Sequence, residues 1–193
     1  MRTFISIHPD EEAIHKISLI QKHLMEKLQA IGDDKFNALK WETVDKFHMT
    51  LFFIGETEKN ISEQMSDRLS QIEMIFSEIK FCTGNISAFP NLRFPRVVIL
   101  EMIEKDSKLV RLVEEIRKAM IEFNLNEEKP FRPHITLARV RRDKKINLAG
   151  MTTAFGNPIE FTVNSFCLYQ SILQPSGSVY KKLKEFRFGA ANG

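Results

Sequence analysis

The feature that most constrains the fold is an order of three elements that occurs twice along the chain. Each time, an apolar run predicts a strand, a helical spacing of apolar residues follows, and a second strand contains His-x-Thr-Leu at or near its start. The first set covers residues 3–8, 10–31 and 47–55, and the second covers residues 97–102, 106–123 and 134–140. The repeat predicts an α+β fold of two pseudo-symmetric lobes, each an antiparallel sheet with helices on its outer face.

The remaining segments extend this repeat. The further predicted elements are a helix at residues 60–79 and strands at residues 80–89, 159–169 and about 178–187. Residues 145–157 fit a short helix and a turn. We interpret residues 1–193 as one bilobal domain whose repeat units cover roughly residues 1–90 and 95–170, followed by a C-terminal strand. The active-site cleft is expected between the lobes.

Each His-x-Thr-Leu segment presents an imidazole and a hydroxyl on the same face of its strand. Side chains alternate across a strand, so residues i and i+2 point the same way. His48 and Thr50 therefore share one face, and His134 and Thr136 share a face of the second strand. The opposite faces, directed toward a core, are apolar: Phe47, Met49 and Leu51 in the first strand, Ile135 and Leu137 in the second.

Two imidazoles and two hydroxyls suit the transfer of a phosphoryl group. Imidazole titrates near pH 6.5, so one ring can accept a proton from an attacking oxygen while the other donates a proton to the leaving oxygen. Hydroxyl groups can donate hydrogen bonds to the non-bridging oxygens, where charge gathers in the transition state. The residue types alone leave open which histidine is the acid and which is the base.

The composition permits an anionic ligand and contains no metal-binding pattern. The net charge of +3 and the pI of about 8.8 are mildly basic. No cluster with metal-ligand spacing occurs, and His8, His15 and His23 do not form a ligand set. We therefore expect neither a metal nor another cofactor.

We expect a monomer in the cytoplasm that does not enter a membrane. The apolar run near the N-terminus is too short for the core of a signal peptide. No segment approaches the roughly 20 apolar residues that cross a bilayer.

The paired motifs and their surroundings resemble the 2H phosphoesterases, and more narrowly the RNA 2′,3′-cyclic phosphodiesterases, also called 2′-5′ RNA ligase-like proteins. The resemblance runs over nearly the whole chain, and the paired motifs are specific for the superfamily. The segments that carry it are Arg-Thr-Phe-Ile at residues 2–5, Phe-His-Met-Thr-Leu-Phe-Phe-Ile-Gly at 47–55, Phe-Arg-Pro-His-Ile-Thr-Leu-Ala-Arg at 131–139, Leu-Tyr-Gln-Ser at 168–171, and Tyr180.

The resemblance implies metal-independent hydrolysis of a 2′,3′-cyclic phosphate at an RNA end to a 2′-phosphate. RNA ends or small cyclic-phosphate nucleotides would be the partners. The resemblance assigns His48 as the proton donor and His134 as the proton acceptor. It assigns Arg139 to phosphate binding, beside Thr50 and Thr136, whose hydroxyl groups already suit that role.

Arg139 can bind the phosphate only if its strand departs from regular alternation. By strict alternation Arg139 faces away from His134, so we expect the strand to bulge or end before it. Arg132 has the same parity as His134 and can reach the cleft instead.

Further residues are candidates for contact with RNA. The basic residues within 141–145 would attract an RNA backbone, although they also suit a solvated turn. Aromatic side chains can stack on a terminal base, and the candidates are Phe4, Trp41, Phe52, Tyr169 and Tyr180.

Three alternative functions remain open from the sequence. Two are phosphodiesterases with other substrates, namely 2′-5′ oligonucleotides or a cyclic phosphate on an ADP-ribose derivative. The third is a non-catalytic module that binds RNA ends. Ligation of RNA ends would use the same groups in reverse.

Overall fold

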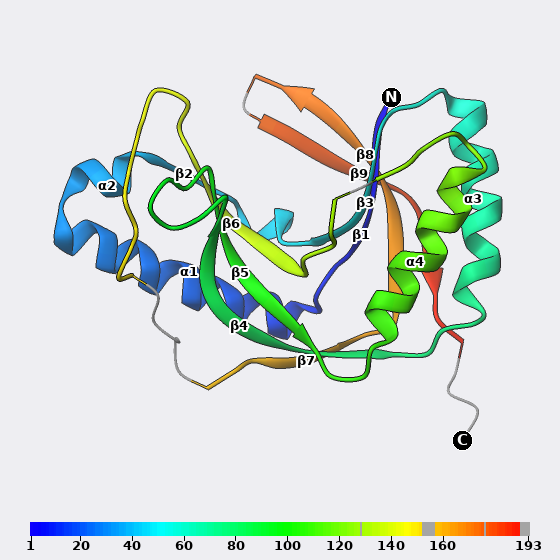
Figure 1. The fold of residues 1–193 in the computed structure, drawn as a ribbon, viewed down its shortest axis with the longest axis horizontal. Helices are drawn as coiled ribbons and strands as arrows, with labels where there is room; N and C mark the ends of the chain where they lie inside the picture. Colours follow the sequence, from blue (N-terminus) through cyan, green and yellow to red (C-terminus); the bar gives the residue numbers. More distant parts are fainter. Residues whose placement is uncertain (128, 152–156, 176, 190–193) are drawn as a thin grey trace.

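The computed structural model describes residues 1–127, 129–151, 157–175 and 177–189, which form two antiparallel sheets (Figure 1). The first sheet consists of β1 (Arg2–Ile7), β3 (Met49–Glu56), β8 (Ser165–Gln174) and β9 (Gly177–Arg187). The second consists of β2 (Leu39–Trp41), β4 (Ile79–Phe89), β5 (Val97–Glu104), β6 (His134–Val140) and β7 (Glu160–Val163). Their orders are β3-β1-β8-β9 and β2-β6-β5-β4-β7, and the predicted α+β class with two lobes is confirmed.

The two lobes are interleaved along the chain. The helices are α1 (Glu11–Ile31), α2 (Asp33–Asn37), α3 (Lys59–Glu73) and α4 (Lys108–Ile121), with a 3-10 turn, η1 (Val44–Lys46). Helix α1 follows β1 of the first sheet but bonds to β6 of the second sheet through Gln21. Helix α4 follows β5 of the second sheet but contacts β3 of the first (Figure 1). Strands β4 and β8 are exchanged in the same way, so each sheet draws on both repeat units.

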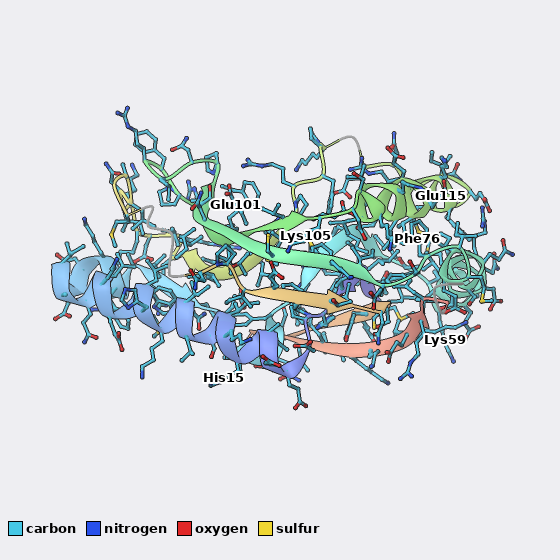
Figure 2. All side chains as sticks on the ribbon, turned by 90° about the horizontal axis from the view of Figure 1, so that it is seen from below. His15, Lys59, Phe76, Glu101, Lys105 and Glu115 are labelled. Atoms are coloured by element: carbon cyan, nitrogen blue, oxygen red, sulfur yellow. The ribbon has the colours of Figure 1, made fainter. Side chains whose placement is uncertain are left out.

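The predicted helix at residues 10–31 is present as α1. Asp10 caps it, because its Oδ1 accepts a hydrogen bond from the backbone N–H of Ala13 at 2.7 Å. Glu11 and Glu12 lie in the first turn, where the helix dipole favours negative charge. The helix ends at Gly32, whose φ of 150° is rare for residues with a side chain. Figure 2 shows α1 along one side of the sheets, with His15 on its outer side.

The core is rich in phenylalanine, which is the commonest aromatic residue of the chain at sixteen copies. Phe166 and Phe186 stack with ring centroids 4.7 Å apart, and both are fully buried. Phe81 and Phe161 stack at 5.5 Å in the second sheet. These pairs combine a large buried area with favourable ring geometry, so they hold adjacent strands together.

Three segments differ from the prediction. The helix predicted at 60–79 ends at Glu73, because the backbone N–H of Ile75 bonds to Ile72 in a tighter turn before β4 begins. The strand predicted at 159–169 is two strands, β7 and β8, since the chain passes from the second sheet to the first at Asn164. The loop predicted after α1 contains α2 and β2, which are too short to show a periodic pattern. Of residues 145–157, those at 152–156 lie outside the described part.

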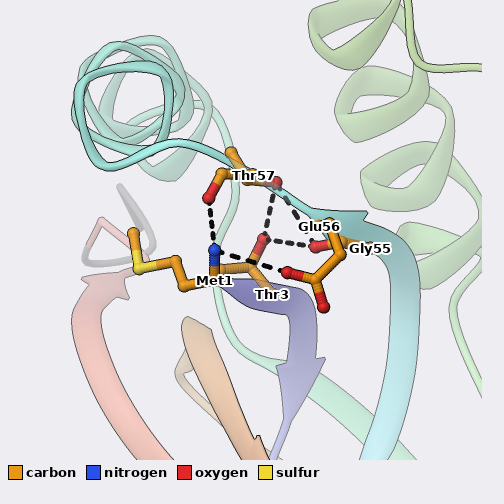
Figure 3. Close-up of polar contacts among 5 residues, drawn as sticks. All are labelled: Met1, Thr3, Gly55, Glu56 and Thr57. Atoms are coloured by element: carbon orange, nitrogen blue, oxygen red, sulfur yellow. Dashed lines mark hydrogen bonds and ion pairs between the residues drawn. The ribbon is translucent and has the colours of Figure 1, made fainter.

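The first residue of the chain is bound to the end of β3 (Figure 3). The Met1 ammonium group donates a hydrogen bond to the carbonyl of Thr57 at 2.6 Å and lies 3.5 Å from the Glu56 carboxylate. The Thr3 hydroxyl is 3.2 Å from that of Thr57 and 3.4 Å from the carbonyl of Gly55. These contacts fix the beginning of β1 beside β3.

In the described residues, no helix combines the length and the apolar character that crossing a membrane requires.

Candidate active site

The two His-x-Thr-Leu segments lie on strands that meet between the sheets. Strand β3 is the edge strand of the first sheet, and it contacts β6 of the second sheet. The five apolar residues predicted to face the core are each at most 2% exposed. Their burial anchors both strands and leaves the alternate side chains half-buried on the other faces: His48, Thr50, His134 and Thr136.

Both histidine rings are held in the same way. The Nδ1 atom of His48 lies 2.6 Å from the carbonyl oxygen of Lys46, and the Nδ1 atom of His134 lies 2.7 Å from that of Arg132. A carbonyl oxygen only accepts, so each Nδ1 must carry the hydrogen. In the neutral rings the free lone pair is therefore on Nε2. In each lobe Nε2 is the atom that can accept or donate a proton in the reaction.

A β-bulge follows the threonine in β3. In the pairing with β1, Thr50 lies opposite Ser6 and Phe52 lies opposite Ile5, which leaves Leu51 without a partner. The bulge reverses the alternation of side chains for the residues that follow it. Phe53 accordingly faces the cavity instead of the core.

The same bulge occurs at the same place in β6. Thr136 lies opposite Ile99 and Ala138 lies opposite Val98, which leaves Leu137 without a partner. The expectation of a bulge before Arg139 is confirmed. Arg139 is consequently on the cleft side of its strand, although it stands five residues from His134.

A cavity of about 430 Å³ lies beside His48 and Thr50. It is lined by residues from both sheets, with β1, β3, β8 and β9 on one side and β2 and β6 on the other. Its size is suitable for a small ligand. His134 and Thr136 are not among its lining residues. His134 is nevertheless close enough to His48 to lower its pKa through charge repulsion. The residues that line the cavity include Arg2, Phe4, Lys40, Trp41, Glu42, Lys46, His48, Thr50, Phe53, Arg139, Gly177 and Tyr180.

Glu42 fixes the guanidinium group of Arg139. The Nε atom of Arg139 donates a hydrogen bond to Oε1 of Glu42 at 3.0 Å. The Glu42 side chain is 19% exposed and that of Arg139 is 54% exposed. The Glu42 carboxylate uses only the Nε–H donor of Arg139. The remaining N–H groups of the guanidinium are therefore available to an anion in the cavity.

The electrostatic surroundings of the two histidines differ. Burial lowers the pKa of His48, and the hydrogen bond to Lys46 and the negative charge of Glu42 oppose this change. Burial also lowers the pKa of His134, and Arg132 and Arg139 lower it further. Arg139 lowers the pKa of both rings, and each ring's backbone hydrogen bond raises its pKa. The two rings differ in that Glu42 favours the protonated form of His48, whereas Arg132 favours the neutral form of His134.

A third histidine, His8, lies against His48. The two rings stack with centroids 5.7 Å apart, and the His8 ring is 4.7 Å from that of Tyr169. Nε2 of His8 is 3.2 Å from the hydroxyl of Ser6. Burial, followed by the charges of His48 and Lys182, lowers the pKa of His8 to about 4. No role for His8 was predicted from the sequence. Prediction of the antiparallel pairing of β1 with β3 would have placed His8, at the end of β1, beside His48, at the start of β3.

The aromatic candidates separate into two groups. Phe4 and Tyr180 surround His48, with ring centroids 5.1 and 5.2 Å from the imidazole. Both residues line the cavity, as does Trp41. Tyr169 is stacked on Phe4 at 5.6 Å. Phe52 is only 2% exposed and belongs to the core, and Phe4 is only 3% exposed, so the prediction that these two rings can stack on a base was wrong.

The remaining basic candidates lie outside the cavity. The guanidinium carbon of Arg132 is 4.9 Å from the centroid of the Phe89 ring, and the carbonyl of Arg132 holds His134. The basic run at residues 141–145 follows β6 on the surface, where Nε of Arg141 donates a hydrogen bond to the carbonyl of Asn37. The structure therefore brings Arg139, and neither Arg132 nor the basic run, to His48.

Metal ligands do not gather at this site or elsewhere in the described residues. Across residues 1–127, 129–151, 157–175 and 177–189, no group of three or more His, Cys, Asp or Glu side chains can hold a metal ion.

Comparison with known proteins identifies the family to which the chain belongs. The 2′-5′ RNA ligase superfamily matches residues 18–173. The chain belongs to this superfamily. A protein of Thermotoga maritima named RNA 2′,3′-cyclic phosphodiesterase is 33% identical over 97% of the chain and 96% of its own length. A protein of Archaeoglobus fulgidus with the same name is 29% identical over 96% of the chain and 99% of its own length.

Solved structures of other proteins share the fold. A crystal structure of a Thermus thermophilus protein superposes with a TM-score of 0.74 at 25% identity and covers 100% of both chains. The crystal structure of Escherichia coli LigT complexed with 3′-AMP has a TM-score of 0.74 at 24% identity and covers 97% of each chain. The chain therefore shares its two-lobed fold with these two proteins.

Proposed function

We propose that this chain hydrolyses the 2′,3′-cyclic phosphate at an RNA end to a 2′-phosphate, using His48 and His134 as acid and base. The observation that carries the proposal is the identical mounting of the two rings. Each ring donates its Nδ1–H to the carbonyl two residues before it, so Nε2 is the nitrogen left to exchange a proton with the substrate or water. The relatives named RNA 2′,3′-cyclic phosphodiesterase support the choice of substrate.

The proposed reaction is an in-line displacement at phosphorus. Nε2 of His134 accepts a proton from water as the water oxygen bonds to phosphorus. The bond from phosphorus to the 3′-oxygen breaks, and Nε2 of His48 donates its proton to that oxygen. The product carries a 2′-phosphate and a free 3′-hydroxyl. Exchange of protons with solvent returns both rings to their starting states.

The local charges support this direction of proton transfer. Glu42 stabilises the protonated form of His48, as an acid requires. Arg132 stabilises the neutral form of His134, as a base requires, whereas Arg139 lowers the pKa of both rings. The assignment agrees with the one that the family resemblance implies.

Thr50, Thr136 and Arg139 are proposed to bind the phosphate. The threonine hydroxyls donate hydrogen bonds to the two non-bridging oxygens, one from each lobe. Arg139, oriented by Glu42, supplies a charged donor from the cleft side of β6. Donors that are fixed before the reaction stabilise the charge that develops on these oxygens.

The test is an assay with a 2′,3′-cyclic mononucleotide and an oligonucleotide with a cyclic-phosphate end, both in EDTA. Phosphorus NMR should identify a 2′-phosphate as the product. His48→Ala and His134→Ala should each reduce turnover by about 10²- to 10⁴-fold. His15→Ala, on the outer side of α1, is the matched control. Full activity in either site variant would overturn the assignment. Turnover of a 2′-5′ oligonucleotide or an ADP-ribose cyclic phosphate in preference would overturn the choice of substrate.

A further inference from the structure

The cavity is lined by cations that the proposed roles of the His and Thr residues do not explain. Arg2, Lys40 and Lys46 line the cavity together with Arg139. Glu42 is the acidic residue of the lining, and it pairs with Arg139. In the part of the chain that the structure describes, Arg2, Lys40 and Lys46 form no ion pair. Their positive charge is therefore available to a ligand.

Lys40 and Lys46 converge at the turn between β8 and β9. A Cβ atom added to Gly177 would lie 3.5 Å from Nζ of Lys40 and 3.7 Å from Nζ of Lys46. Because both distances share one point, the two ammonium groups are at most about 7 Å apart. Their mutual repulsion is unfavourable in the free protein, and an anion between them would remove it. Gly177 has a φ of 131°, so a residue with a side chain would be strained at this place.

The charge of the reacting group is too small to account for this set. A 2′,3′-cyclic phosphate carries one negative charge, and Thr50, Thr136 and Arg139 are available to bind it. We propose that Lys40 and Lys46 form a second phosphate site, which binds the 5′-phosphate of the terminal nucleotide. In an RNA chain this group is the phosphodiester that joins the terminal nucleotide to the one before it. The inference rests on the proposed function.

The arrangement of the cavity fits a nucleoside between the two phosphate sites. Tyr180 touches the His48 ring, and it lies three residues along β9 from Gly177. A strand rises about 3.4 Å per residue, so the lysine pair is on the order of 10 Å from the Tyr180 backbone. Phe4, Trp41 and Tyr180 line the same cavity as the two sites. The lysines lie at the turn end of the β8–β9 hairpin, next to Gly177.

The experiment measures binding of product analogues, which needs no turnover. Calorimetry would compare a nucleoside 2′-phosphate, a nucleoside 2′,5′-bisphosphate, and a dinucleotide that ends in a 2′-phosphate. The second phosphate should tighten binding about tenfold. It should also make binding more sensitive to salt concentration, because salt screens the added ion pairs. The variant Lys40→Gln/Lys46→Gln should bind all three ligands with the same affinity and the same salt dependence.

The matched control is Lys181→Gln. Lys181 lies on β9 next to Tyr180, but it lines a different cavity, beside α3. Removing its charge should leave the tenfold difference between the ligands in place. Thermal unfolding of each variant at the wild-type temperature would show that the fold is intact.

Each outcome decides the proposal. A retained tenfold difference in the double variant would overturn the lysine site, as would equal binding of all three ligands by the wild type. Tighter binding of the bisphosphate without tighter binding of the dinucleotide would assign the site to free nucleotides and overturn the role in RNA binding. A binding difference that the double variant abolishes, in a protein without hydrolytic activity, would support the lysine site and overturn the proposed function alone.

Discussion

Leu51 and Leu137 occupy equivalent positions in the two lobes, because each is the unpaired residue of a β-bulge directly after the threonine of its motif. The leucine of His-x-Thr-Leu therefore does more than fill the core. It marks the point at which the alternation of side chains reverses, so that the fifth residue after each histidine returns to the cleft side. In one lobe this residue is Phe53 and in the other it is Arg139.

Equivalent positions of the two threonines predict comparable losses. Thr50→Val and Thr136→Val keep the side-chain shape and remove one hydroxyl donor each. If both donate to the phosphate, each change should lower kcat about 10²-fold with a smaller effect on KM. Steady-state kinetics on the cyclic mononucleotide measures this, with Thr162→Val on the exposed face of β7 as the control. Wild-type kcat in either variant would remove that threonine from the mechanism.

The pH dependence follows from the pKa values of the two histidines. The base must be neutral, so the rate rises with pH through its pKa, and the acid must be protonated, so the rate falls with pH through its pKa. Burial lowers both pKa values in the free protein. The optimum of kcat/KM should therefore lie below pH 6.5, the ordinary value for imidazole. An optimum above pH 7 at constant ionic strength would contradict this account.

Glu42→Gln assigns the acid and the base independently of family resemblance. The carboxylate raises the pKa of His48 and is not among the groups that shift the pKa of His134. Its neutralisation should lower the pKa of His48 alone. If His48 is the acid, the alkaline limb of the kcat/KM profile moves to lower pH and the acidic limb stays. Movement of the acidic limb instead would make His48 the base.

Gln21 ties the bulge of β6 to the segment that carries Glu42. Its side-chain amide donates hydrogen bonds of 2.8 Å to the carbonyl oxygens of Leu137 and Glu42, and the residue is buried. Gln21→Met keeps the volume and loses both bonds, so the free energy of unfolding should fall by about 2 kcal/mol. Urea unfolding measures the change, and Gln29→Met on the exposed side of α1 is the control. Equal stability of the two variants would show that the bulge is held by other contacts.

The sequence predicted what depends on local pattern. Period-two alternation placed the histidines and threonines opposite a buried face, and the parity of Arg139 required a bulge that the structure contains. The interleaving of the lobes was not predictable, because the choice between β5 and β1 as the partner of β4 depends on contacts between distant segments. Strand β2 has three residues, too few to show an alternating pattern in the sequence. The pairing of Arg139 with Glu42, which directly follows β2, was therefore not predictable either. The monomeric state and the cytoplasmic location stay predictions.

His8 predicts a specific loss of stability in acid. Its pKa is about 4 in the folded protein, chiefly through burial, and the ordinary value of 6.5 applies after unfolding. Between these pH values the unfolded chain binds more protons than the folded one, so the free energy of unfolding falls as the pH falls from 6.5 to about 4. His8→Gln removes this contribution, which is at most on the order of 3 kcal/mol.

Urea unfolding at several pH values between 7.5 and 4 tests the role of His8, with His15→Gln as the control for loss of a surface histidine. His8→Gln should lose less stability than the wild type over this interval, although His48 and His134 keep part of the slope because burial lowers their pKa values as well. An unchanged slope would mean that His8 takes up its proton in the folded protein. A second positive charge would then lie against His48 and would favour the neutral form of that ring, which is the opposite of what a proton donor needs.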